Sequence, residues 1–222
     1  LDHYVPAEEL EIKDGKICWK KDESIFIPLA EITACYKDPD GRGIAGPIIG
    51  RGSYAPSKMT NLDPETGQGA PGLFWTFGAT AAEVEVDVET GEIKVLQLAT
   101  AMDAGKAIHP DICYAQIHGG TIMGLSTALY EEIQLDKRRI VNPNFTDYKI
   151  CTIKNVPYIK SFIIETPETD GPFNARGVGE QPMIAVAPAV ANAVANALGV
   201  SINTFPLTPE RIVELWNKRG EK

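Results

Sequence analysis

The sequence contains few of the residues that build metal sites, disulfide frameworks or nucleic-acid interfaces. It has only three histidines, and His109 and His118 have no partner at metal-ligand spacing, so we expect neither to bind a metal ion. None of the four cysteines forms a Cys-x-x-Cys pair, which favours free thiols over disulfides, zinc or an iron–sulfur cluster. They are Cys18, Cys35, Cys113 and Cys151. The formal net charge of -9 argues against nucleic acid as a partner.

Long apolar runs and targeting signals are also lacking. No uninterrupted apolar run reaches the length of a membrane span, since Asn192 and Asn196 interrupt the most apolar segment. The first ten residues have neither the basic start nor the apolar core of a signal peptide. We therefore expect a cytoplasmic protein with no membrane partner. The chain also begins with Leu1 and not with methionine, and we expect either a fragment of something longer or one gene product of a split subunit.

What the chain does contain is the composition of an ordinary globular protein. Its 222 residues, 44% of them hydrophobic, are enough for one large domain or two small ones. Apolar and acidic residues alternate over 79–88, and Thr90-Gly91 turns the chain into a second strand at 92–101. Asp14-Gly15 predicts a hairpin between 10–13 and 16–20. Further strands are expected at 24–27, 48–54 and 158–165, helices at 28–36 and 208–219, and loops at 37–47, 57–73 and 136–147.

A helix is expected over 111–132, and it contains Gly119, Gly120 and Gly124. Each glycine inside a helix costs about 1 kcal/mol relative to alanine. Three of them require a reason, and close packing against backbone or a ligand is the natural one. Together with a buried helix over 182–198, these elements predict an α+β fold of antiparallel strand pairs packed with glycine-rich buried helices.

The most informative segment is the glycine-rich turn before that second helix. Gly177 and Gly179 can adopt backbone angles that other residues avoid, and they let a ligand approach the main chain. Glu180 follows at the predicted start of the helix, where free N–H groups point outward. The carboxylate therefore suits either a catalytic base or a helix cap.

Several separate segments resemble one family. The matching stretches, in order, are 103–105 with 108–110, 116–124 with 130–132, 142–150, and 177–180 with Pro182; the opening residues 5–17 add to them. The chain resembles the C-terminal part of the molybdenum-binding (molybdopterin) subunit of the xanthine dehydrogenase / aldehyde oxidase family of molybdenum hydroxylases. It departs from the family pattern at His118, Met123 and Cys151. The family's first molybdenum domain and its iron–sulfur and flavin modules are missing.

The resemblance implies a role for several residues. In the family a pterin dithiolene holds the molybdenum, and Glu180 resembles the active-site base that takes a proton from a hydroxyl ligand of the metal. Gly177, Val178 and Gly179 would bring backbone N–H groups to the metal's ligands. Gln116 resembles a glutamine that bonds the pterin, although it could also be a polar helix residue facing a loop. No residue of this chain is expected to bind the metal directly.

The resemblance also implies a partial molybdopterin-binding domain over 1–222, like the family's second such domain. Its parts would be a hairpin and helix region at 1–56 and a cofactor-contacting region at 74–222. The implied cofactor is molybdopterin, in its plain or cytosine dinucleotide form, with iron–sulfur clusters and FAD on partner chains or domains. The implied partners are the remaining molybdenum-domain chain, an iron–sulfur subunit and a flavin subunit.

The implied function is that of an enzyme component that oxidises a purine- or nicotinate-like N-heterocycle, or an aldehyde, with water as the oxygen source. We expect the isolated chain to be inactive. The alternatives are a non-catalytic assembly module and a generic anion-binding α+β domain. Two side chains near the turn stay open: Arg176 could steer an anionic substrate or pair with an acid, and Phe173 could stack on a flat substrate or lie in the core.

Overall fold

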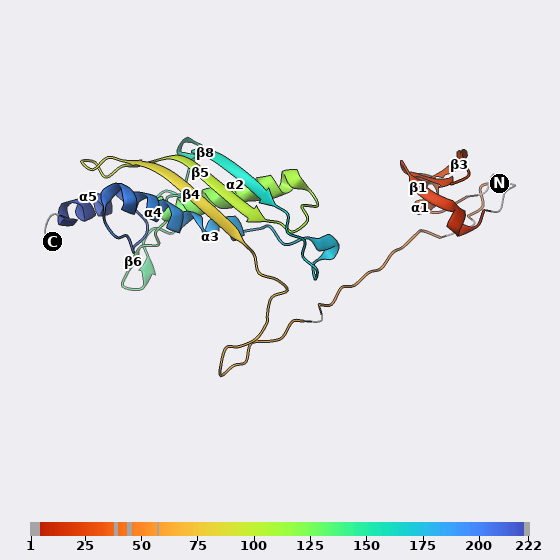
Figure 1. Cartoon of the computed structure of the whole chain (residues 1–222), viewed down its shortest axis with the longest axis horizontal. Helices are drawn as coiled ribbons and strands as arrows, with labels where there is room; N and C mark the ends of the chain where they lie inside the picture. The colour runs from red at the N-terminus through yellow and green to blue at the C-terminus, as the bar shows by residue number, and fades with distance from the viewer. Residues whose placement is uncertain (1–4, 38–39, 44–45, 57, 220–222) are drawn as a thin grey trace. The chain divides into compact units, whose positions relative to one another are not determined.

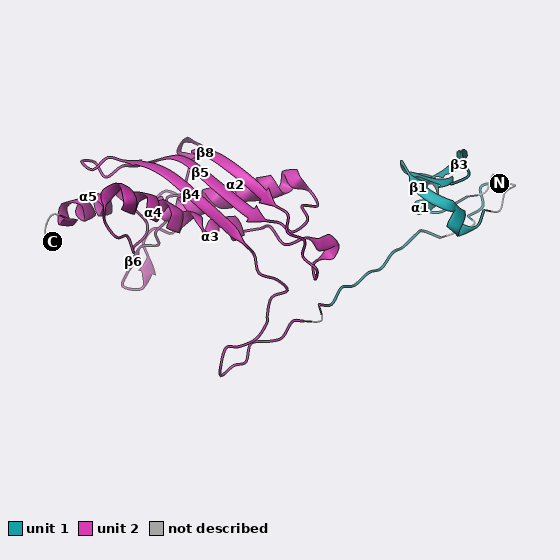
Figure 2. Cartoon of the chain, in the orientation of Figure 1, with its two compact units in different colours: residues 1–55 teal, residues 56–222 magenta. Residues whose placement is uncertain are grey.

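The computed structural model describes residues 5–37, 40–43, 46–56 and 58–219, and the chain divides into two compact units, 1–55 and 56–222 (Figure 2). The first unit holds a short 3-10 helix, η1 (Ala7–Glu9), and three antiparallel strands, β1 (Leu10–Lys13), β2 (Lys16–Trp19) and β3 (Asp22–Pro28), followed by α1 (Leu29–Thr33). Asp14 and Gly15 have φ values of 48° and 72°, as a two-residue hairpin turn requires. The predicted hairpin is therefore confirmed.

The predicted strand over 48–54 is wrong. Those residues have no regular secondary structure, and no β-ladder among the described residues includes them. Alternation of apolar and polar residues alone does not make a strand, because a strand also needs a neighbour to accept its backbone hydrogen bonds. The predicted loop over 57–73 does lack helix and strand where the structure describes it.

The second unit is built on a three-stranded sheet in the order β4 (Gly78–Val86), β5 (Ile93–Asp103) and β8 (Tyr158–Ile164). The antiparallel β4–β5 pair was predicted, and Asp87 closes its turn by accepting the N–H groups of Glu89 and Thr90. The pairing of β5 with β8 is parallel, which the antiparallel pattern in the sequence did not predict. Helix α2 (Pro110–Leu129) lies in the sequence between these two parallel strands.

Three helices follow the sheet (Figure 1). They are α3 (Gln181–Ile184), α4 (Val186–Leu198) and α5 (Pro209–Lys218). The predicted helix over 182–198 is thus two helices, which meet at Ala185. Pro188 explains the break, because it has no N–H to donate to the carbonyl of Ile184 and its ring crowds that carbonyl. In α5, Thr208 caps the first turn by accepting the N–H of Arg211.

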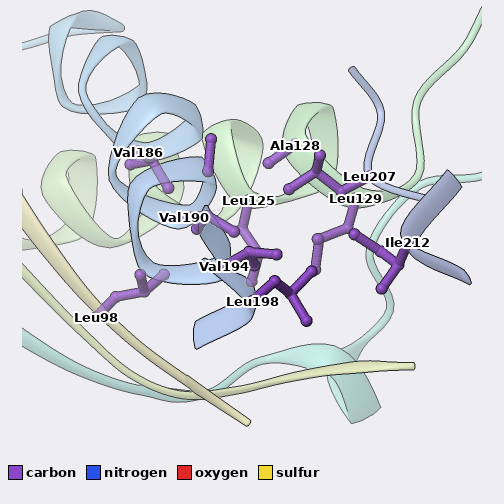
Figure 3. Packing of buried hydrophobic residues seen from close by; sticks show 11 residues of the cluster. Leu98, Leu125, Ala128, Leu129, Val186, Val190, Val194, Leu198, Leu207 and Ile212 are labelled. Atoms are coloured by element: carbon purple, nitrogen blue, oxygen red, sulfur yellow. The ribbon is translucent and has the colours of Figure 1, made fainter. Parts of the chain in front are cut away.

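The hydrophobic core of the second unit lies between the sheet and the helices α2, α4 and α5 (Figure 3). Val186, Val190 and Val194 are fully buried and lie one helical turn apart on α4, where they face Leu98 of β5 and Leu125 of α2. By length and mean hydropathy the segment Gln181–Leu198 reaches the size of a membrane span, although Asn192 and Asn196 interrupt its apolar run. Its valine stripe packs into this core, and a core helix has the same composition.

Smaller elements complete the unit. They are a two-stranded hairpin, β6 (Leu135–Asp136) and β7 (Arg139–Ile140), and two 3-10 helices, η2 (Ile153–Asn155) and η3 (Pro172–Asn174). The hairpin falls in a predicted loop. It turns through Lys137 and Arg138, both with positive φ, and the sequence there contains none of the residues that favour such angles.

Candidate functional site

The turn at 103–105, at the end of β5, is the base to which the glycine-rich segment is attached. Asp103, at the end of β5, accepts the N–H of Gly105 at 2.9 Å and that of Thr166 at 3.1 Å through Oδ1. Gly105 has φ +61°, and a Cβ there would lie 2.5 Å from the carbonyl oxygen of Asn174. Only glycine satisfies both conditions, so the tight contact between the two loops depends on it.

The chain from η3 is attached to this turn by backbone hydrogen bonds. Ala175 forms an antiparallel bridge with Gly105, and Arg176 donates its N–H to the carbonyl of Ala104 at 2.8 Å. Lys106 donates its N–H to Asn174 at 2.7 Å. The backbone is therefore fixed up to Arg176, the residue directly before Gly177.

The side chain of Arg176 pairs with acids and does not face solvent. Its Nη1 lies 3.0 Å from Oδ2 of Asp103 and its Nη2 lies 3.2 Å from Oε2 of Glu168, and the side chain is 9% exposed. The guanidinium also lies 5.4 Å from the ring centre of Phe77. Of the two roles left open for Arg176, the structure shows the ion pair. Phe173 is 84% exposed with φ 53°, so it is not a core residue.

Burial of Asp103 by itself raises the pKa of its carboxyl group. The N–H donors of Gly105 and Thr166, together with the neighbouring positive charge of Arg176, outweigh burial and hold the pKa below its ordinary value. Asp103 therefore stays ionised in the folded chain and remains a partner for Arg176.

Helices α2 and α3 fix the other side of the segment. A Cβ on Gly120 would lie 2.9 Å from Cβ of Pro182, and a Cβ on Gly124 would lie 2.6 Å from the carbonyl oxygen of Met183. The expectation that these glycines permit close backbone packing is confirmed. Gly119 differs, because a Cβ there would have no atom within 4 Å.

Between these two anchors the glycines of the segment have no contact that explains them. Neither Gly177 nor Gly179 has a positive φ, so the backbone angles that we expected of them are not used. A Cβ on either would lie 3.7 Å or more from its nearest neighbour, the side-chain amide of Gln181, which is an ordinary contact distance. Packing among the described residues thus leaves room for side chains at both positions.

The backbone N–H groups of the segment divide into two kinds. That of Gly179 is donated to Oε1 of Gln181 at 2.6 Å and is not available to a ligand. Those of Gly177 and Val178 have no acceptor in the part of the chain that the structure describes. Gln181 was not among the residues predicted from the sequence, although an amide directly after Glu180 was the signal that could have found it.

Glu180 is the N-cap residue of α3, but its side chain makes no capping hydrogen bond. The helix-cap interpretation is therefore not realised. The side chain is exposed, and α3 is a single turn, so the positive end of a long helix is not present there. A cavity of about 470 Å³ lies instead among residues 133–148, lined by Ile133, Ile140, Asn142, Pro143, Asn144, Phe145 and Tyr148.

Gln116 precedes Gly120 and Gly124 on α2 at intervals of about one turn. A Cβ on Gly120 would meet Pro182 and Met183, and one on Gly124 would meet Met183 and Val186, so α2 and α3 run in the same direction. Gln116 is therefore displaced one turn toward the residues that precede Pro182. It is exposed, as a residue that binds a group from outside the chain must be.

The histidines and cysteines were expected not to bind a metal ion, and their surroundings are as follows. His109 caps α2 by accepting the N–H of Ile112 through Nδ1 at 3.3 Å. Among the described residues no group of three or more His, Cys, Asp or Glu side chains is arranged to hold a metal ion, and all four cysteines are free thiols.

Residues 2–157 match the model of a family described as the molybdopterin cofactor-binding domain. The chain belongs to this family. The matched range contains Gln116 and ends before Gly177. The chain is 37% identical over 146 residues to the putative xanthine dehydrogenase molybdenum-binding subunit XdhA of Escherichia coli K12, which covers 65% of this chain and 19% of that protein. It is 34% identical over 166 residues to an aldehyde oxidoreductase of Megalodesulfovibrio gigas, covering 73% of this chain and 18% of that protein.

Solved structures show the same fold. The aldehyde oxidoreductase from Desulfovibrio gigas superposes with a TM-score of 0.67 at 33% identity, covering 72% of this chain and 18% of that one. Quinoline 2-oxidoreductase from Pseudomonas putida 86 gives 0.70 at 28% identity, covering 96% and 26%. The α+β fold and the likeness to molybdenum hydroxylase subunits are thus confirmed. The chain spans about a fifth of the length of the relatives that it matches.

Proposed function

We propose that this chain supplies the proton-accepting side of the active centre in a molybdenum hydroxylase, with Glu180 as the base. The observation that carries the proposal is the combination of open glycines, free N–H groups and an uncapped carboxylate within the four residues 177–180. When bound, a molybdenum–pterin group would supply the redox chemistry, with water as the oxygen source.

The residues of this segment suit a molybdenum–pterin group that approaches the chain from outside. The exposed backbone at Gly177 permits close approach, and the N–H groups of Gly177 and Val178 would donate to its oxygen or sulfur atoms. Gly179 would contribute its lack of a side chain, since Gln181 occupies its N–H. The amide of Gln116 would donate to and accept from the pterin edge. The carboxylate of Glu180 would accept a proton within hydrogen-bonding reach.

The rest of the assembly is proposed on the same basis. The wall facing Glu180 would come from the remaining molybdenum domain, because no described residue of this chain buries that side chain. Iron–sulfur and flavin partners, the cytosine dinucleotide form of the cofactor, the division into regions 1–56 and 74–222, and a cytoplasmic location stay predictions. So does the substrate, an N-heterocycle or an aldehyde.

The proposal is tested by Glu180→Gln in the assembled enzyme, with Glu83→Gln on the exposed face of β4 as the matched control. We expect turnover to fall by about 10²-fold or more, the range of general-base catalysis, with molybdenum content unchanged. Near-normal turnover would remove Glu180 from the mechanism. Loss of molybdenum with unchanged turnover per bound molybdenum would favour the non-catalytic assembly module.

The isolated chain provides a second test. We expect no turnover from it, because the described residues leave Glu180 exposed. Turnover by this chain alone would contradict the proposal that another chain or domain completes the site. The generic anion-binding alternative predicts phosphate affinity without molybdenum, and the single turn of α3 gives it little support.

A further inference from the structure

We propose that Arg176 is a positioning residue for Glu180, held in place by Asp103 and Glu168. This inference rests on the proposed function, since it names what sets the place of the base. Arg176 does not reach the reacting atoms. It fixes the backbone at the start of the segment 177–180, beside the end of β5.

The two ends of the segment 177–180 are held in different ways. On its C-terminal side, Pro182 is buried against Gly120, and the single turn of α3 begins at Gln181. On its N-terminal side the attachment is the ion pair and the backbone bond of Arg176. Among described residues, the bond from Gly179 to Gln181 is the one hydrogen bond made by the N–H groups of 177–179.

Both the main chain and the side chain of Arg176 contribute to this attachment. The N–H of Arg176 reaches Ala104 at 2.8 Å, and its guanidinium reaches Asp103 at 3.0 Å. Asp103 in turn holds the N–H groups of Gly105 and Thr166. One carboxylate thus joins β5, the chain after β8 and the residue before Gly177.

The attachment requires the guanidinium group of Arg176 and not only a positive charge. Its two terminal nitrogens reach two different acids, Asp103 and Glu168, whose side chains are 8% and 14% exposed. A lysine has one nitrogen and cannot span both acids in a fixed plane. Two nearly buried carboxylates left without a full partner would repel each other, so the loop would open at this point.

The experiment uses the assembled enzyme with Arg176→Lys and Asp103→Asn, and Arg139→Lys on the exposed β7 as the matched control. Turnover, KM and molybdenum content are measured together with deuterium uptake by peptides that cover 177–180. We expect both site variants to lower kcat about tenfold or more with KM within twofold. Uptake at 177–180 should rise severalfold while uptake in α5 stays unchanged.

Asp103→Asn keeps the size of the side chain and its Oδ1 acceptor, so it carries the test if Arg176→Lys does not accumulate. Normal kcat and normal uptake in the variants would overturn the proposal. Failure of both variants to fold would also overturn it, because the pair would then support the whole unit and not this segment.

Failure of the proposed function is distinguishable from failure of this inference. Glu180→Gln should lower turnover without changing uptake at 177–180, since its side chain makes no capping bond. If Glu180→Gln is fully active, the base is wrong, and the uptake of Arg176→Lys still decides whether Arg176 holds the segment.

Discussion

Two pairs of glycines in the second unit lie close together and differ in what they contact. Gly120 and Gly124, in the middle of α2, are pressed against α3 so closely that a methyl group has no room at either position. Gly177 and Gly179, just before α3, have room for a side chain and no unusual backbone angle. The first pair is explained by the fold. The second pair has no explanation within the described residues, which makes it the better indicator of a ligand from outside.

The largest effect that tests this comparison is expected from Gly124→Ala. The new Cβ would lie 2.6 Å from the carbonyl oxygen of Met183 and 2.7 Å from Cβ of Val186, which are backbone and a fully buried valine. Overpacking of this kind costs about 1–3 kcal/mol, and we expect the upper end, measured as the free energy of unfolding in urea. An unchanged free energy would show that α2 and α3 are not packed as described.

A small effect on stability and a large effect on function are expected at Gly177 and Gly179, which we call the open pair. Gly177→Ala and Gly179→Ala should each change the free energy of unfolding of the chain by about 0.5 kcal/mol or less, as at an ordinary surface site. In the assembled enzyme the same changes should lower molybdenum content or turnover by about tenfold, because the methyl group would separate the backbone from its ligand. Normal molybdenum content and turnover in both variants would leave the open pair without a function.

Much of this comparison could be predicted from local sequence, and the rest could not. The hairpin at Asp14-Gly15 was predicted because it depends on two adjacent residues. The packing role of Gly120 and Gly124 was predicted because repeated glycines within one helix are a local signal, although the residues they pack against, Pro182, Met183 and Val186, lie far along the chain. The role of Arg176 could not be decided, because its partner Asp103 lies 73 residues away. The parallel pairing of β5 with β8 was missed for the same reason.

Two errors have a different cause. The alternating residues 48–54 form no strand, because no neighbouring strand among the described residues accepts their backbone bonds. The break between α3 and α4 was available from the sequence, since Pro188 stands four residues after Ile184. Length and apolar composition favoured one helix, and the missing N–H divides it into two.

A smaller effect should come from acidification of the purified chain. Asp103 has a lowered pKa in the folded state, so its contribution to stability is complete above its unfolded pKa of about 3.9 and is lost as the pH falls through the folded value. Deuterium uptake at 177–180, corrected for intrinsic exchange, should therefore stay constant from pH 8 to about 5 and rise below about 4. Uptake around Gly124 should rise later, because Met183 and Val186 hold it by packing. A rise near neutral pH would point to another titrating group.

An effect of opposite sign is expected from Gly119→Ala. Gly119 is next to Gly120 in α2, but a Cβ there would have no neighbouring atom within 4 Å. Alanine in place of an unconstrained helical glycine stabilises by about 0.5–1 kcal/mol, because the unfolded chain loses freedom and the helix gains propensity. Urea unfolding of the purified chain should show this gain, whereas Gly124→Ala shows a loss. If the gain is present and the assembled enzyme also keeps its molybdenum, the surface at Gly119 is free of close contacts. If the gain is present and molybdenum is lost, the neighbour that excludes a methyl group at Gly119 lies outside this chain, as proposed for Gly177.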